Sequence, residues 1–231
     1  MEEYNVTNLV FSSSCTVYGE PKTIPVSEKD ERQEANSPYG NTKSVCEDIL
    51  RDLSKSGSKI KTIALRYFNP IGAHDSSLIG ELPVGVPNNL IPFITQTAIG
   101  KREELTVFGD DYETEDGSCI RDYIHVTDLA LAHIKAIQKN SELTNSGYNI
   151  FNVGTGNGNS VFEVIKTFET VTNQKLNYKV GPRREGDVQA VFADASYTER
   201  NLGWKATKTL KEALESAWNW ELKLKERGDD I

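Results

Sequence analysis

Two residues four positions apart, Tyr39 and Lys43 in "SPYGNTKS", have the types and the spacing needed for proton transfer. On a helix they share one face. A free tyrosine is a poor base because its pKa is about 10, but a nearby lysine ammonium favours the phenolate. With a hydroxyl such as that of Ser14 bridging to the substrate, the pair could deprotonate an alcohol while a nicotinamide takes the hydride. The motif also occurs by chance in many helices, so it requires structural context.

The surrounding sequence predicts that context. "NLVFSS" (8–13) and "IKTIALRYFN" (60–69) are expected to be buried strands. Between them, Ser37 and Pro38 are typical of a helix start, and Gly57 of its end. A strand, a helix and a second strand with this spacing predict a βαβ unit and a parallel sheet. Ligands bind beyond the carboxyl ends of such strands, where Ser14, Tyr39 and Asn69 fall.

The remaining chain alternates further elements. We expect a helix over 90–99, strands over 105–109, 120–126 and 148–154, and a helix capped by Thr127 that runs to about residue 140. Ser160 with Glu163, and Thr209 with Glu212, predict capping boxes for two more helices. "GTGNG" (154–158) lacks the full glycine spacing of a dinucleotide loop and is interpreted as a turn.

Composition narrows the function classes. The net charge of −8 argues against a nucleic-acid partner, and the apolar runs are too short to span a membrane. The cysteines are too widely spaced for a disulfide framework or a metal site, which favours a reducing cytoplasm. The histidines show no metal-ligand spacing, so we expect no metal.

The chain resembles the UDP-glucose 4-epimerase family of extended short-chain dehydrogenases/reductases. The resemblance rests on motifs that follow one another along nearly the whole chain: "FSSSCTVYG", "SPYGNTKS", "LRYFNPIGAH", "VPNNLIPF", "VFGDDYETEDGSCIRDYIHVTDLA", "NVGTGNGNSVFEV" and "RREGDV". It implies an α/β fold: a partial, doubly wound Rossmann-like parallel sheet plus a smaller mixed α/β lobe for the UDP-sugar. It also implies bound NAD, interconversion of UDP-glucose and UDP-galactose through a 4-keto sugar, and a homodimer.

The same resemblance assigns residues to roles. Tyr39 is expected to be the base, Lys43 its partner and cofactor anchor, and Ser14 the bridging hydroxyl. Tyr67 and Phe68 are expected near the nicotinamide. The residues expected to contact the UDP-sugar are Ser14, Asn69, Asn89, Leu90, Val107, Phe108, Arg121, Arg184, Asp187 and Val191. Because valine is small, Val191 is expected to leave room for an N-acetylhexosamine. The alternatives without a ligand role are that "RRE" (183–185) is a solvent-exposed run of charges and that Val191 only packs against a strand.

The family's glycine-rich phosphate loop should precede "NLVFSSS" by roughly a hundred residues. We therefore expect this chain to carry the second half of the Rossmann-like lobe (1–75) and the substrate lobe (76–231), with 148–172 returning to the main sheet. Two alternatives stay open: a fragment that binds UDP-sugars without catalysis, and a related nucleotide-sugar enzyme. A 4,6-dehydratase is disfavoured because Cys15 and Thr16 stand where those enzymes need an Asp-Glu pair.

Overall fold

In a computed structural model, which describes residues 1–140, 142 and 147–228, the chain divides into two compact units. The first unit comprises 1–68, 128–157 and 191–206; the second comprises 69–127, 158–190 and 207–231. The division falls at residue 68 rather than 75 because the strand that starts at Asn69 pairs within the second unit. The segment expected to return to the main sheet, 148–172, is divided at residue 157 between the two units.

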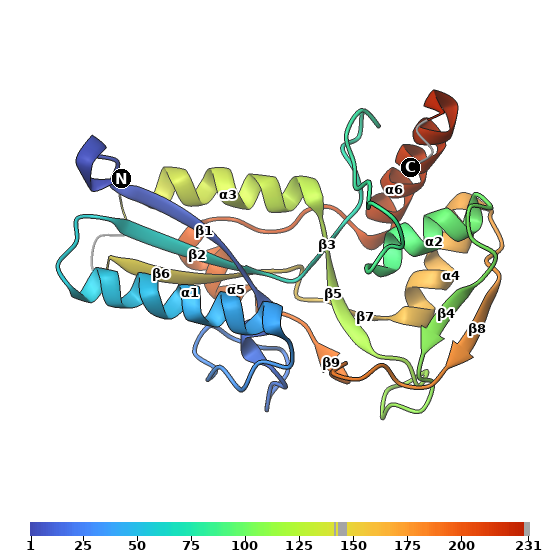
Figure 1. The fold of residues 1–231 in the computed structure, drawn as a ribbon, viewed down its shortest axis with the longest axis horizontal. Helices are drawn as coiled ribbons and strands as arrows, with labels where there is room; N and C mark the ends of the chain where they lie inside the picture. Colours follow the sequence, from blue (N-terminus) through green and yellow to red (C-terminus); the bar gives the residue numbers. More distant parts are fainter. Residues whose placement is uncertain (141, 143–146, 229–231) are drawn as a thin grey trace. The chain divides into compact units, whose positions relative to one another are not determined.

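The first unit is built on a parallel sheet with strand order β1-β2-β6 (Figure 1). Its elements are η1 (Glu2–Tyr4), β1 (Asn8–Ser14), η2 (Cys15–Tyr18), α1 (Pro38–Lys55), β2 (Lys61–Tyr67), α3 (Val126–Asn140), β6 (Tyr148–Val153) and α5 (Ser196–Leu202). The sheet core is apolar because β2 buries Ile63, Ala64 and Leu65 completely. This confirms the predicted βαβ unit and the α/β fold class.

Helices α1 and α3 cover opposite faces of this sheet (Figure 1). Arg66 contacts Glu47 of α1, whereas the ring of the next residue, Tyr67, lies 6.3 Å from the ring of His133 in α3. Successive side chains of a strand point to opposite faces. Both faces of the sheet are therefore covered, which is consistent with the run of buried residues in β2.

The second unit mixes short strands with helices. Its elements are β3 (Asn69–Ile71), α2 (Leu90–Ala98), β4 (Leu105–Phe108), β5 (Ile120–His125), β7 (Gly158–Ser160), α4 (Val161–Thr172), β8 (Tyr178–Gly181) and α6 (Leu210–Arg227). β5 pairs in parallel with β3 and antiparallel with β7, and β4 pairs in parallel with β8. The short β9 (Ala190–Val191) spans the residues at which the chain passes back to the first unit.

Local capping signals set several helix boundaries as predicted. Ser160 and Thr209 each form a complete capping box, with Glu163 and Glu212 respectively. The prediction for Thr127 is wrong: α3 begins at Val126, and the Thr127 backbone N–H donates to Nδ1 of His125 at 3.0 Å. His125, the residue just before the helix, thus caps α3 with its imidazole, which is the role expected of the Thr127 hydroxyl.

Candidate active site

The carboxyl ends of the strands in the first unit place Ser14 beside Tyr67. The two residues are partners in the parallel register of β1 and β2, and Tyr67 is in turn the partner of Val153 in β6. Ser14 is buried, and its Oγ accepts hydrogen bonds from the backbone N–H and the hydroxyl of Thr16, at 3.2 and 3.0 Å. Since a hydroxyl also carries one donor, Ser14 keeps its own hydrogen to give to a ligand.

Helix α1 brings Tyr39 and Lys43 to the same region. The Ser37 hydroxyl accepts from the Gly40 N–H at 3.1 Å and Pro38 occupies the first turn, so the helix starts just before Tyr39. Tyr39 is 50% exposed and therefore accessible to a ligand. Lys43 Nζ donates to the carbonyl of Ser12 at 2.9 Å and lies 5.5 Å from the centre of the Tyr39 ring.

Tyr67 and Phe68, both expected near a nicotinamide, differ in accessibility. The side chain of Tyr67 is half-buried, whereas that of Phe68 is buried in the core. The Phe68 backbone N–H donates to the carbonyl of Val153 at 3.1 Å, which fixes the chain at this strand end. Within the first unit, only the tyrosine of this pair therefore presents a ring to the surface.

This arrangement fits a nicotinamide cofactor and proton-transfer chemistry. A lysine ammonium has three donors, and the Ser12 carbonyl takes one, which leaves others for a ribose. Tyr39 supplies an accessible phenol beside that charge, and Ser14 supplies a hydroxyl. Among the described residues no cluster of His, Cys, Asp and Glu could hold a metal ion.

The second unit contains a cavity of about 590 Å³ that is bordered by β3, β4, β5 and the start of α2. Nearly all the residues expected to contact a UDP-sugar line it: Asn69, Asn89, Leu90, Val107, Phe108, Arg121, Arg184 and Asp187. These residues are scattered over more than a hundred positions of sequence, and the fold of this unit brings them together.

Two arginines line the cavity, together with the carboxylates Glu81 and Asp187. Arg121 is mostly buried, and its guanidinium contacts Asp187 at 3.5 Å and donates to the carbonyl of Ile120 at 2.9 Å. Arg184 is exposed, and its guanidinium has no hydrogen-bond or ion-pair partner among the described residues. A free guanidinium next to a positioned one is suited to an anion with several oxygen atoms.

The amino end of α2 adds unused donors at the same cavity. Asn89 is its N-cap residue, but the side chain makes no capping bond and instead donates to Glu81 at 2.8 Å. No side chain of the N-cap therefore accepts from the first backbone N–H groups of the helix, which remain available to a ligand. A helix N-terminus attracts anions. Asn69 Oδ1 is also buried at the cavity and lacks a partner in the described part of the chain.

Two other polar groups at the cavity, Cys119 and Tyr123, stay uncharged. Burial raises the pKa of Cys119 and of Tyr123, although Arg121 opposes this in both cases. Both groups are therefore neutral near pH 7. Besides its two carboxylates, the cavity combines neutral and apolar walls with guanidinium groups, which suits a ligand with a base at one end and phosphates at the other.

Two expected substrate contacts, Ser14 and Val191, do not line this cavity; Ser14 belongs to the first unit, and so does Val191. Val191 is 6% exposed. The proposed role of Val191 in substrate selection thus stays a prediction.

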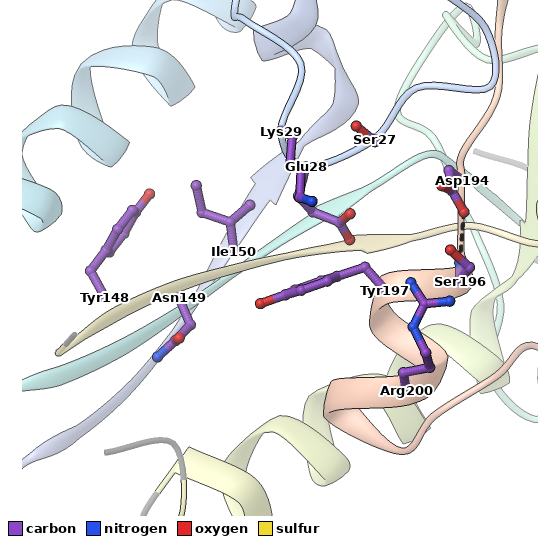
Figure 2. Close-up of a pocket in the computed structure, with 10 residues that line it drawn as sticks. All are labelled: Ser27, Glu28, Lys29, Tyr148, Asn149, Ile150, Asp194, Ser196, Tyr197 and Arg200. Atoms are coloured by element: carbon purple, nitrogen blue, oxygen red, sulfur yellow. Dashed lines mark hydrogen bonds between the residues drawn. The ribbon is translucent and has the colours of Figure 1, made fainter. Parts of the chain in front are cut away.

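Figure 2 shows a different cavity, of about 510 Å³, in the first unit. Tyr148, Asn149 and Ile150 of β6 line it, so it lies along the amino-terminal half of that strand, away from the carboxyl ends where ligands bind in parallel sheets. Its carboxylate Glu28 already accepts bonds from the Asn152 N–H and the Thr198 hydroxyl. This cavity is therefore not our candidate site.

Sequence reasoning did not identify Glu47 and Arg66, which form a buried ion pair below the strand ends. Glu47 follows Tyr39 and Lys43 at helical spacing, on the face of α1 that packs on the sheet. A glutamate on a buried helix face needs a charged partner. The position of Glu47 in the helical pattern could therefore have indicated a buried ion pair.

The fold and these residues define a class. A parallel sheet covered by helices, with Tyr-x-x-x-Lys starting a helix at its carboxyl edge, is the arrangement of a Rossmann-like short-chain dehydrogenase/reductase.

Comparisons with known proteins narrow the class further. The sequence model of the family described as GDP-mannose 4,6 dehydratase matches residues 1–217. A UDP-glucose 4-epimerase of Haemophilus influenzae is 48% identical over 221 residues, which are 96% of this chain and 65% of that protein. The crystal structure of a UDP-glucose 4-epimerase from Stenotrophomonas maltophila, with bound NAD and formylated UDP-arabinopyranose, has a TM-score of 0.93 and 46% identity, and covers 98% of this chain and 67% of that one. A UDP-Glc/GlcNAc 4-epimerase from Campylobacter jejuni has a TM-score of 0.77 and 38% identity, over 96% and 66% of the two chains.

The chain therefore belongs to the GDP-mannose 4,6 dehydratase family, and its relatives within that family are UDP-glucose 4-epimerases. This confirms the resemblance seen in the sequence. The chain spans about 65% of the length of the curated relatives it matches.

Proposed function

We propose that this chain provides the catalytic residues and the UDP-sugar site of an NAD-dependent UDP-glucose 4-epimerase. The observation that carries the proposal is the cavity of the second unit, because it gathers the residues that the family resemblance assigned to the nucleotide sugar. On this proposal, the first unit is the catalytic half of a Rossmann-like lobe and the second unit is the substrate lobe.

The diphosphate would bind where the cavity offers positive charge. Arg184 would supply a free guanidinium, Arg121 a guanidinium held by Asp187, and the start of α2 its unused N–H groups. Asn69 would place its buried amide at the same group. The uracil would lie by Val107 and Phe108, and Asp187 would accept from the ribose. These contacts bind the substrate without discriminating between the two C4 configurations.

Proton transfer would fall to the first unit. Tyr39 would take the proton of the sugar C4 hydroxyl through or beside Ser14, and Lys43 would hold a positive charge near the phenolate as it forms. NAD, when bound, would supply reversible hydride acceptance for C4. Tyr39 would then give its proton to the C4 oxygen as the hydroxyl forms again, which returns the tyrosine to its starting state. Tyr39, Lys43, Tyr67 and the chain at Phe68 would be the cofactor contacts of this unit.

The interconversion extends to UDP-N-acetylhexosamines in this proposal. Val191 is small, and a 38% identical relative is described as acting on both UDP-Glc and UDP-GlcNAc. The absence of an Asp-Glu pair at Cys15 and Thr16 disfavours dehydration, even though the family is described by a dehydratase.

The test joins residues 1–231 to the part of the Haemophilus influenzae relative that this chain does not match. The chimera, supplied with NAD, should convert UDP-galactose to UDP-glucose, as measured by a coupled dehydrogenase assay. Isothermal titration of the unfused chain with UDP is the parallel measurement, since the proposed nucleotide contacts lie in the second unit. UDP binding without turnover by the chimera would favour the non-catalytic alternative, and a 4-keto-6-deoxy product would favour a dehydratase.

A further inference from the structure

A buried salt bridge joins helix α1 to the sheet of the first unit. Glu47 of α1 is 2% exposed and Arg66 of β2 is 3% exposed. The guanidinium binds the carboxylate with two hydrogen bonds, from Nε at 2.9 Å and from Nη2 at 2.5 Å. The hydroxyl of Ser13 in β1 donates to the same carboxylate at 2.5 Å. One carboxylate thus ties together α1, β1 and β2.

Surrounding contacts hold the guanidinium in its orientation. Arg66 stacks over the ring of Tyr18 at 4.7 Å, and the Tyr18 hydroxyl donates to Asn152 in β6 at 2.7 Å. Arg32 approaches Glu47 at 3.7 Å and donates to the carbonyl of Ser44 at 3.0 Å. The buried carboxylate is therefore both neutralised and fixed in direction.

Stability alone is a weak explanation for this network. A buried ion pair recovers its desolvation cost only with good geometry, and well-packed apolar residues of similar volume often stabilise a protein equally well. A directional carboxylate that contacts two strands instead specifies the position of one helix.

The position that it specifies is that of the proton-transfer residues. Tyr39, Lys43 and Glu47 recur at intervals of four, so they share one face of α1. Lys43 bonds to the carbonyl of Ser12 and Glu47 bonds to the hydroxyl of Ser13, the adjoining residue of β1. Two successive turns of the helix are thus attached to two successive residues of the strand that ends at Ser14.

We propose that Glu47 is a positioning residue, which holds α1 against the end of β1 through Ser13 and Arg66 and thereby places Lys43 and Tyr39. The proposal deepens the function proposed above and rests on it. Neither the carboxylate nor Arg66 touches the substrate; both act through the helix.

The kinetic test uses Glu47→Gln in the chimera, because glutamine keeps the size and removes the charge. A misplacement of about 1 Å can cost 10²-fold in rate, so we expect kcat to fall by about 10–100-fold while KM for UDP-galactose stays within about twofold. The matched control is Glu221→Gln in the second unit: Glu221 is also buried and pairs with Lys101 at 3.2 Å. The control should lose stability but keep its kcat. Equal kcat losses in both variants, or no loss in Glu47→Gln, would overturn the proposal.

A second measurement on the unfused chain does not depend on activity. Hydrogen exchange of the α1 amides is compared in the wild type, Lys43→Met, Glu47→Gln and the double variant. If Glu47 positions Lys43, the lysine substitution should accelerate exchange by about fivefold in the wild type and much less in the Glu47→Gln background, because residues in one network couple. If the effects of Lys43→Met and Glu47→Gln on the exchange rate simply add in the double variant, the positioning role of Glu47 is refuted. A chimera without epimerase activity but with a coupled exchange cycle would refute the proposed function and leave the positioning role supported.

Discussion

The ammonium of Lys43 donates a hydrogen bond to the backbone carbonyl of Ser12 at 2.9 Å, which fixes its charge at the carboxyl end of β1. A lysine side chain is otherwise flexible, and holding it in one geometry costs conformational entropy. The hydrogen bond to the Ser12 carbonyl offsets that cost. It places the ammonium 5.5 Å from the centre of the Tyr39 ring. Lys43 is therefore an oriented charge beside an accessible phenol.

The first prediction concerns Tyr39→Phe in the chimera. It should lower kcat by about 10²–10⁴-fold, because the lost hydroxyl acts in proton transfer. UDP affinity should change little, since the proposed nucleotide contacts lie in the second unit. Steady-state kinetics and UDP titration measure the two effects separately. A variant with the wild-type rate would show that another group is the base.

The second prediction compares neighbouring arginines on the unfused chain. Arg184→Ala should weaken UDP binding by about 10–100-fold, since a hydrogen bond to a charged group is worth about 1.5–3 kcal/mol. Arg183→Ala is the matched control: Arg183 bonds Asp111 at 2.7 Å, packs on Tyr112 and does not line the cavity. Calorimetric titration with UDP should show a loss only for Arg184→Ala. Equal losses would mean that general positive charge, rather than a specific contact, binds the nucleotide.

Local signals made much of the fold predictable. The helix start at Ser37 and Pro38 and the capping boxes at Ser160 and Thr209 depend on bonds between residues three apart, which the sequence displays directly. The buried strands β1 and β2 were visible as short apolar runs. The residues that the family resemblance assigns to a UDP-sugar line one cavity, but no local pattern links positions 69, 121 and 184, so the sequence pattern alone does not predict that they meet.

One local contact and several long-range contacts account for what the sequence analysis missed. The Thr127 hydroxyl is a plausible cap by residue type, but His125, at the end of β5, accepts from the Thr127 backbone N–H and caps the helix two residues earlier. Glu47 and Arg66 are separated by a helix end, a turn and most of a strand, so their pairing depends on the packing of α1 on the sheet. The return of 128–157 and 191–206 to the first unit likewise depends on contacts between distant segments.

The third prediction concerns Asp116 and acid stability. Its carboxylate accepts from the Ser118 N–H at 3.0 Å, from the Ser118 hydroxyl at 2.8 Å and from the Ser160 hydroxyl. Partial burial acts to raise its pKa, but these hydrogen bonds outweigh burial and hold the pKa below the ordinary value of 3.8. The stabilisation is therefore complete above about pH 4 and is lost as the pH falls through the lowered pKa.

Asp116→Asn should accordingly lower the thermal midpoint by a few degrees at pH 7. The difference from the wild type should shrink as the pH falls below 4, which thermal melts at a series of pH values would measure. A difference that stayed constant down to pH 2 would show that the charge of Asp116 does not contribute.

The same loop also requires glycine at position 117, because φ is 80° there and a Cβ would lie 2.0 Å from the carbonyl oxygen of Asp110.

The last prediction concerns substrate range and Val191. The family resemblance puts this residue near the hexose, where a bulky aromatic would occupy the space of a 2-acetamido group. In this chain the side chain is 6% exposed and small. Steric exclusion can reject a larger substrate strongly, whereas a pocket gains only about 1–3 kcal/mol from one extra methylene. We therefore expect the wild-type chimera to act on UDP-galactose and on UDP-N-acetylgalactosamine.

Val191→Tyr should abolish the second activity and retain the first, whereas Val191→Ala should retain both and shift their ratio toward UDP-N-acetylgalactosamine. The ratio of kcat/KM for the two substrates is the measurement, because a general loss of folded protein lowers both values and leaves their ratio unchanged. Since Val191 is buried, thermal melts of each variant check that the tyrosine is accommodated. The alanine variant keeps the prediction testable if the tyrosine variant does not fold, since a residue that only packs a strand would lose stability without a change in this ratio. A wild-type chimera that is inactive on UDP-N-acetylgalactosamine but fully active on UDP-galactose would contradict the idea, because some other part of the site would then exclude the acetamido group.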